Sequence, residues 1–213
     1  MKKILVLLCL CSTMCINTIF TQPSSAYSCP VEKDVAISYE EILHVALARC
    51  TSRVPESKKI ELLNRLLKIE HRYSPPPDLR GMILAAACME SGFNPAAKGD
   101  RRFSRNGRSP KAIGILQQWP FYERVYGTNR LDPTSAAHGW MKHIVRMIPR
   151  VKKQCGYKSE KKIWVAAWVT GIRYKKSGGR CQETPKHWRL LRKWHREIRK
   201  ERRKVCLPNN STQ

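Results

Sequence analysis

Acidic side chains are scarce in this chain. Asp and Glu number 16 against 41 Lys and Arg, which gives a formal net charge of +25 over 213 residues. A protein with this charge associates with polyanions such as nucleic acid, anionic lipid or acidic wall polymers. The hydrophobic share of 42% fits a globular chain with one ordinary domain, and it argues against a disordered protein.

Long apolar runs are also missing, apart from one near the amino end. That run, Ile4–Cys11, follows Lys2 and Lys3, and Asn17 breaks it well before the ~20 apolar residues that a membrane helix needs. Ser24-Ser25-Ala26 then offers a small-residue cleavage site. The pattern predicts a signal peptide over residues 1–26, export to the periplasm or the extracellular space, and no transmembrane span.

No two cysteines after residue 26 stand at a C-x-x-C spacing, which argues against a zinc site. A lipoprotein anchor at one of the three earlier cysteines is disfavoured, because the expected small residues do not precede them. An even number of cysteines in an exported chain predicts disulfides, although the sequence does not choose their pairing. The six that remain after cleavage are Cys29, Cys50, Cys88, Cys155, Cys181 and Cys206.

Apolar residues recur at helical spacing, which predicts a mainly α fold. Ser38-x-x-Glu41 is a capping-box pattern that opens the first helix. A second helix is expected from about Pro55 to Arg72, with Glu70 and His71 at a solvated end. Its predicted core stripe is Ile60, Leu63, Leu66, Leu67 and Ile69.

The third expected helix is apolar nearly all round, as a central buried helix would be. We expect Asp78 to cap its start, and the helix to run to Glu90, where Gly92, Asn94 and Pro95 stop it. A carboxyl group at such a helix end is a candidate acid with a raised pKa.

A further helix is expected from Asp132-Pro133 to about Val151. His138 and His143 are five residues apart, so they do not share a face suited to a metal, and we expect them at the surface. The predicted inward residues of this helix are Ala137, Trp140, Met141, Ile144, Val145 and Ile148.

The segment Lys175–Lys204 holds thirteen Lys and Arg and three Glu. Trp188, Leu191, Trp194 and Ile198 recur within it at helical spacing, which favours a terminal helix packed on the domain. The opposite face of this helix is basic, and it could bind an anionic envelope polymer or a nucleic acid.

Two motifs carry a family resemblance. Glu90-Ser91-Gly92-Phe93-Asn94-Pro95-x-Ala97 and Ala112-x-Gly114-Ile115-Leu116-Gln117 resemble the signature of soluble lytic transglycosylases, which have a lysozyme-like fold and are related to goose-type lysozymes. Lys111 stands where the family usually has Gly, and the gap between the halves is longer, with the additional residues in Gly99–Pro110. This basic segment is expected to be a loop, either solvated or forming a lip over an anionic substrate.

A third segment departs from the family pattern. Ala167-Trp168-Val169-Thr170-Gly171 lies where Ala-Tyr-Asn-Ala-Gly is usual, so Trp replaces Tyr and Val replaces an Asn that helps to hold Glu and substrate. We expect four parts in the chain: a signal peptide at 1–26, a helical segment at 27–77, a catalytic core at 78–182, and a basic helix and tail at 183–213. The resemblance implies that the core is lysozyme-like.

The resemblance also implies cleavage of the β-1,4 bond between N-acetylmuramic acid and N-acetylglucosamine in peptidoglycan, with a 1,6-anhydro product. Glu90 would then be the catalytic acid and base, and Ser91 would orient it or the substrate. Gln117, Gln118 and Trp168 are the further candidate substrate-binding residues, because sugar sites combine amide groups with flat aromatic faces. No cofactor or metal is implied, and a monomer is expected.

Two alternatives stay open. A lysozyme-type hydrolase on the same scaffold would use a second carboxylate, for which Asp100 and Asp132 are the candidates. A non-catalytic, cationic protein that binds wall or other polyanions would explain the charge and the missing Asn.

Overall fold

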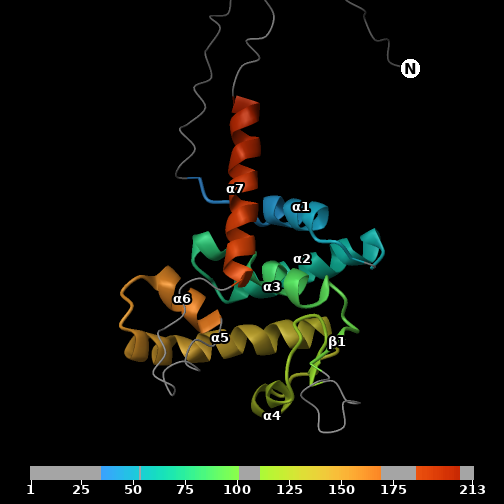
Figure 1. Ribbon diagram of the computed structural model, residues 1–213, viewed down its shortest axis with the longest axis vertical. Helices are drawn as coiled ribbons and strands as arrows, with labels where there is room; N and C mark the ends of the chain where they lie inside the picture. Colours follow the sequence, from blue (N-terminus) through green and yellow to red (C-terminus); the bar gives the residue numbers. More distant parts are fainter. Residues whose placement is uncertain (1–34, 53, 101–110, 169–185, 207–213) are drawn as a thin grey trace, which may run out of the picture. The chain divides into compact units, whose positions relative to one another are not determined.

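The computed structural model describes residues 35–52, 54–100, 111–168 and 186–206 (Figure 1). The chain divides into two units, residues 1–30 and 31–213, and every described residue belongs to the second. The predicted signal peptide therefore lies outside the described residues. None of the described helices is both long enough and apolar enough to cross a membrane.

The described part of the chain is mainly α, which confirms the predicted fold class. It contains seven α-helices, one short 3-10 helix and one pair of two-residue strands. In chain order these are α1 Tyr39–Arg49, α2 Glu56–Arg72, η1 Pro77–Leu79, α3 Met82–Ser91, β1 Lys98–Gly99, β2 Ala112–Ile113, α4 Phe121–Tyr126, α5 Pro133–Cys155, α6 Glu160–Trp168 and α7 Lys186–Cys206.

Local sequence signals fix the starts of two helices. The capping box of α1 is present: Glu41 N donates to Ser38 Oγ at 3.2 Å, and Ser38 N donates to the Glu41 carboxylate at 2.8 Å. Asp132 caps α5 through Ser135 N at 2.6 Å, with Pro133 as its first residue. Both arrangements satisfy backbone N–H groups that have no partner inside the helix.

Helix α3 lies at the centre of the core. Residues 82–87 are buried, and the helix contacts α1, α2 and α7. Such a helix needs apolar side chains on every face, which explains its lack of a polar stripe. The predicted buried central helix is therefore confirmed.

Helix α7 packs on α1 and α3 through its apolar stripe. Trp194 and Leu191 are fully buried, and Trp188 and Ile198 are nearly so. All four residues predicted to face the domain do face it. Arg202 of α7 also donates from Nε and Nη2 to the two carboxylate oxygens of Glu41, at 2.6 Å each, and so joins the last helix to the first.

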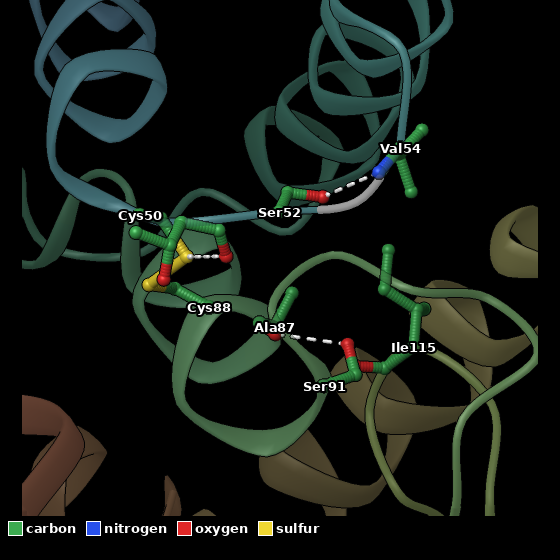
Figure 2. Close-up of a disulfide and its surroundings, with 8 residues drawn as sticks. Cys50, Ser52, Val54, Ala87, Cys88, Ser91 and Ile115 are labelled. Carbon is green, nitrogen blue, oxygen red and sulfur yellow. Dashed lines mark hydrogen bonds between the residues drawn. A yellow bond between two sulfur atoms is a disulfide. The ribbon is translucent and has the colours of Figure 1, made fainter.

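One disulfide fixes the end of α1 to α3. Cys50, the residue that follows α1, is bonded to Cys88, two residues before Glu90 (Figure 2). Cys155 at the end of α5 is also disulfide-bonded. Cys29 and Cys181 lie outside the described residues, as does the side chain of Cys206. Disulfide formation, predicted from the even cysteine count, is thus present in the described part of the chain.

The two strands form a small antiparallel hairpin, in which Lys98 pairs with Ile113 and Gly99 with Ala112. The first family-like motif ends just before β1, and the second begins with β2, so the predicted insertion lies between the two motifs. Residues 101–110 of that insertion lie outside the described residues. Gly114 follows β2 with φ +80°, and a Cβ there would lie 1.9 Å from the Arg130 carbonyl oxygen, so only glycine fits this turn.

Three expectations about packing are wrong. Asp78 does not cap α3. It lies in η1 and accepts a bond from Lys161 Nζ at 2.6 Å, while Gly81 precedes α3. Ile60 of α2 is 38% exposed and Val145 of α5 is 40% exposed, because each lies at the edge of its apolar stripe and faces solvent.

Candidate active site

Glu90 lies in the last turn of α3, where the buried helix reaches the surface. Its side chain is 37% exposed, in contrast to the fully buried residues one and two turns earlier. Gly92 ends the helix in the left-handed conformation, with φ +58°. The carboxyl group therefore extends from a rigid, packed helix toward solvent.

The nearest polar partner of this carboxyl group comes from the other end of the chain. His187, the second residue of α7, lies with Nε2 2.7 Å from Glu90 Oε1. The imidazole ring also stacks on Trp168, with a centroid separation of 5.8 Å and an interplanar angle of 19°. Trp168 in turn packs edge-on against Trp140 of α5 at 6.1 Å. We call these four residues the Glu90 cluster: Glu90 of α3, His187 of α7, Trp168 of α6 and Trp140 of α5.

A tyrosine adds a neutral hydroxyl group near the cluster. Tyr122 of α4 is buried, and burial raises its pKa above the usual range, with the charges of Tyr126 and Glu90 contributing in the same direction. Tyr122 therefore stays protonated in any ordinary buffer.

Trp168 offers little surface to a ligand. It is 5% exposed, and its indole Nε1 is buried with no hydrogen-bond partner among the described residues. The remainder of the family-like segment, residues 169–171, lies outside the described residues. Contact between Trp168 and a substrate stays a prediction.

Ser91 connects the end of α3 to the hairpin. Its Oγ lies 3.0 Å from Ala87 O and 2.8 Å from Ile115 O, so its single proton is shared between the backbone carbonyl groups of the two segments (Figure 2). The residue thus holds the turn after β2 against the helix that carries Glu90. Its predicted role in orienting Glu90 remains untested.

Gln117 lies on the turn that follows β2, with φ +46°. Its Nε2 donates to Gly114 O at 2.9 Å, which holds the amide group across the hairpin. A Cβ on Gly99 would lie 2.3 Å from Gln117 Oε1, so glycine at this position of β1 leaves room for the amide. The side chain is partly exposed and remains a candidate for substrate binding.

Gln118 points into the protein. It is 2% exposed, and its Nε2 donates to Ala136 O at 2.8 Å, which ties the hairpin to α5. This geometry supports a structural role for the side chain. Direct contact with a substrate, the role predicted from the sequence, is untested and would require the amide to leave its buried position.

The two carboxylates considered for a hydrolase are engaged elsewhere. Asp100 accepts a bond from Trp119 Nε1 at 3.0 Å, and Asp132 caps α5.

A carboxyl group with a raised pKa lies in α2, at Glu70. Glu70 is fully buried, although the sequence predicted a solvated position, and burial raises its pKa to about 7. Gly81 N and Ile83 N donate to its two oxygens at 2.7 and 2.8 Å, so its side chain caps α3 in place of Asp78. These two hydrogen bonds stabilise the start of α3. Because the carboxyl group has no exposed surface, it cannot contact a substrate.

The predicted surface position of His143 is wrong. It packs against the rings of Phe121, Tyr122 and Tyr126, and Tyr126 Oη lies 2.9 Å from its Nδ1. Burial lowers the pKa of His143. His138 is half-buried, with Nδ1 3.2 Å from Tyr73 Oη.

His187 was not predicted from the sequence as a site residue. It lies 97 residues from Glu90, and a single histidine in a basic segment gives no periodic or spacing signal. Only the packing of α7 on α3 brings the two side chains together.

A polar hollow lies beside the disulfide. It has a volume of about 440 Å³ and is lined by Thr51, Ser52, Ser91, Gly92 and Asn94. Glu90 is not among these lining residues, so the hollow is not part of the Glu90 cluster.

Among the described side chains, no group of three or more His, Cys, Asp and Glu residues is placed to hold a metal ion. Comparison of the chain with protein-family models, with curated proteins and with solved structures found no match.

Proposed function

We propose that this protein is an exported enzyme that cleaves the β-1,4 bond between N-acetylmuramic acid and N-acetylglucosamine by lytic transglycosylation, with Glu90 as acid and base. The observation that carries the proposal is the carboxyl group of Glu90, half exposed at the end of a buried helix and bordered by His187. The motif resemblance around Glu90 and Gln117 identifies the substrate class. The Cys50–Cys88 disulfide fits an oxidising compartment.

The reaction needs one proton donor that later becomes a base. Protonated Glu90 gives its proton to the glycosidic oxygen while the bond from that oxygen to the muramic C1 breaks and an oxocarbenium-like centre develops. The acetamido group of the same sugar stabilises this centre. The Glu90 carboxylate then takes the proton of the C6 hydroxyl group, and the oxygen of that hydroxyl group bonds to C1. This bond closes the 1,6-anhydro ring. Glu90 ends protonated, and no water is consumed.

The engagement of Asp100 and Asp132 in structural hydrogen bonds supports this route over a hydrolase. An inverting hydrolase needs a second carboxylate that is free to activate water, and a retaining one needs it as a nucleophile. A reaction in which the acetamido group of the substrate stabilises the intermediate needs no second carboxylate.

The basic face of α7 is the proposed contact with anionic parts of the envelope. Arg189, Lys193, Arg196, Lys200 and Arg203 are exposed and recur every three or four residues, opposite the buried tryptophans. At 1.5 Å per residue they span roughly 20 Å of the helix. Such a row would hold the enzyme on an acidic polymer while Glu90 acts on the glycan.

Digestion of purified sacculi tests the proposal. Wild-type protein should release fragments with 1,6-anhydromuramic ends, which mass spectrometry distinguishes from reducing ends by the loss of water. Glu90→Gln should reduce the initial rate by about 100-fold or more, because it removes the acid and the base together. Glu56→Gln, which changes an exposed glutamate at the start of α2, is the matched control and should leave the rate unchanged.

Reducing ends would identify a hydrolase instead. If the wild-type protein binds sacculi and releases no fragments, the chain is a binding protein, the alternative favoured by its charge of +25. Full activity of Glu90→Gln would refute both enzymatic assignments.

A further inference from the structure

The first turn of α7 brings a histidine to the carboxyl group on which the proposed reaction depends. We propose that His187 is a positioning residue for Glu90: it holds Oε1 and thereby leaves Oε2 to exchange the proton with the substrate. This inference rests on the proposed function. Its basis is the 2.7 Å separation between His187 Nε2 and Glu90 Oε1.

The imidazole is itself held in place. Its ring lies nearly parallel to the indole of Trp168, and Trp168 packs edge-on against Trp140. The histidine is 21% exposed and its glutamate partner 37% exposed. A glutamate at the surface has several accessible rotamers, whereas a hydrogen bond from a ring with a fixed plane selects one of them.

The hydrogen bond suits both halves of the reaction. With His187 in its Nε2–H tautomer, Nε2 donates to Oε1, which accepts equally as the carbonyl oxygen of the acid and as one oxygen of the carboxylate. The proton that moves to the glycosidic oxygen, and the one that returns from the C6 hydroxyl group, are both carried by Oε2. His187 does not change its own protonation in either step.

A purely structural role is the competing explanation, because His187 could serve only as a flat ring packed on Trp168. Two substitutions separate the roles. His187→Phe keeps a flat ring for the indole and removes the nitrogen that bonds Glu90. His187→Gln removes the ring and keeps an amide Nε2 that reaches the same oxygen. Lys186→Gln, at the exposed neighbouring residue, is the matched control.

The experiment measures kcat and KM on soluble glycan strands and thermal unfolding for wild type, Glu90→Gln and the three α7 variants. We expect His187→Phe to lower kcat by about 10- to 100-fold with KM nearly unchanged, as expected when a reacting group is misplaced but substrate contacts remain. His187→Gln should keep at least a third of wild-type kcat, although it lowers the unfolding temperature. Lys186→Gln should match wild type.

The outcomes distinguish the two proposals. If wild type does not cleave glycan strands, the proposed function fails and this inference falls with it. If wild type cleaves them and Glu90→Gln does not, retention of kcat by His187→Phe overturns the positioning role alone. Should the Phe variant fail to fold, the Gln variant decides, and a kcat below about a tenth of wild type in folded protein overturns the role.

Discussion

The buried carboxyl group of Glu70 makes the stability of this protein depend on pH in an unusual direction. Burial raises the pKa of Glu70 from 4.5 to about 7, against the opposing effects of Ile83 N, Gly81 N and the Tyr39 hydroxyl group. Between these two values the folded protein keeps a proton that the unfolded chain has lost. The stability that Glu70 contributes is thus complete below about pH 4.5 and is lost as the pH rises toward 7.

The size of the effect follows from the shift. One pKa unit corresponds to about 1.4 kcal/mol, so a shift from 4.5 to about 7 makes the folded state less stable by about 3 kcal/mol at neutral pH than at pH 4.5. The group is fully buried, so solvent screening does not reduce this figure.

The perturbation that isolates the effect is Glu70→Gln, which keeps the shape of the side chain and cannot ionise. Urea unfolding of both proteins, with the disulfides intact, should be measured in steps from pH 4.5 to 7.5. The free energy of unfolding of wild type minus that of Glu70→Gln should fall by about 3 kcal/mol over this range. His138, His143 and His195, whose pKa values are lowered by burial, affect both proteins alike and cancel in the difference.

Glu61→Gln, at an exposed position on the same helix, is the control and should give a flat difference. A flat difference for Glu70→Gln as well would refute the reasoning. It would mean that the two backbone donors of α3 hold Glu70 ionised throughout, and that hydrogen bonding outweighs burial.

Three other perturbations test two contacts between helices and the basic face of α7. Replacing Cys50 and Cys88 together by Ala should lower the free energy of unfolding by about 4 kcal/mol, the chain-entropy value for a separation of 38 residues, as measured by urea denaturation. Glu41→Gln should remove about 1 kcal/mol at neutral pH, because the pair with Arg202 is partly exposed. Since that pair lowers the pKa of Glu41 to about 2, the same stability in wild type should be lost as pH falls from 4.5 toward 2. Changing Arg189, Lys193 and Arg196 to Gln should weaken binding to sacculi and reduce its sensitivity to salt in a pull-down assay, whereas Lys58, Lys68 and Arg72 changed together on α2 should not.

The parts of the fold that the sequence predicted correctly are those fixed by local patterns. Ser38 with Glu41, and Asp132 with Pro133, determine helix starts within a few residues, so the signal needs no knowledge of distant packing. The buried stripe of α7 follows from its spacing alone, because one face of an isolated amphipathic helix has to be covered.

The wrong predictions depend on contacts between helices. Glu70 lies in the last turn of α2, where an acidic residue normally meets water. The chain instead returns over it through η1, and α3 begins with its free N–H groups directed at the carboxyl group. Asp78 was predicted to cap α3, but it lies in η1, and Gly81 is the residue that precedes α3. His143 is partly buried because three aromatic rings of α4 pack against it.

The candidate site was predictable only in part for the same reason. The position of Glu90 at the end of a buried helix follows from the apolar run before it. Its pairing with His187 does not, because that contact exists only after α7 has docked on α3.

The docking of α7 has a consequence for the order in which the Glu90 cluster is assembled. Ribosomes make the chain from its amino end, so α7 emerges after every other helix described here. Until it does, the surfaces of α1 and α3 that receive Trp194 and Leu191 stay uncovered, and Glu90 lacks its imidazole neighbour. A nascent chain that stops short of residue 186 would thus carry Glu90 without the imidazole of His187 beside it, so the Glu90 cluster forms only after α7 has been made and has packed on α3.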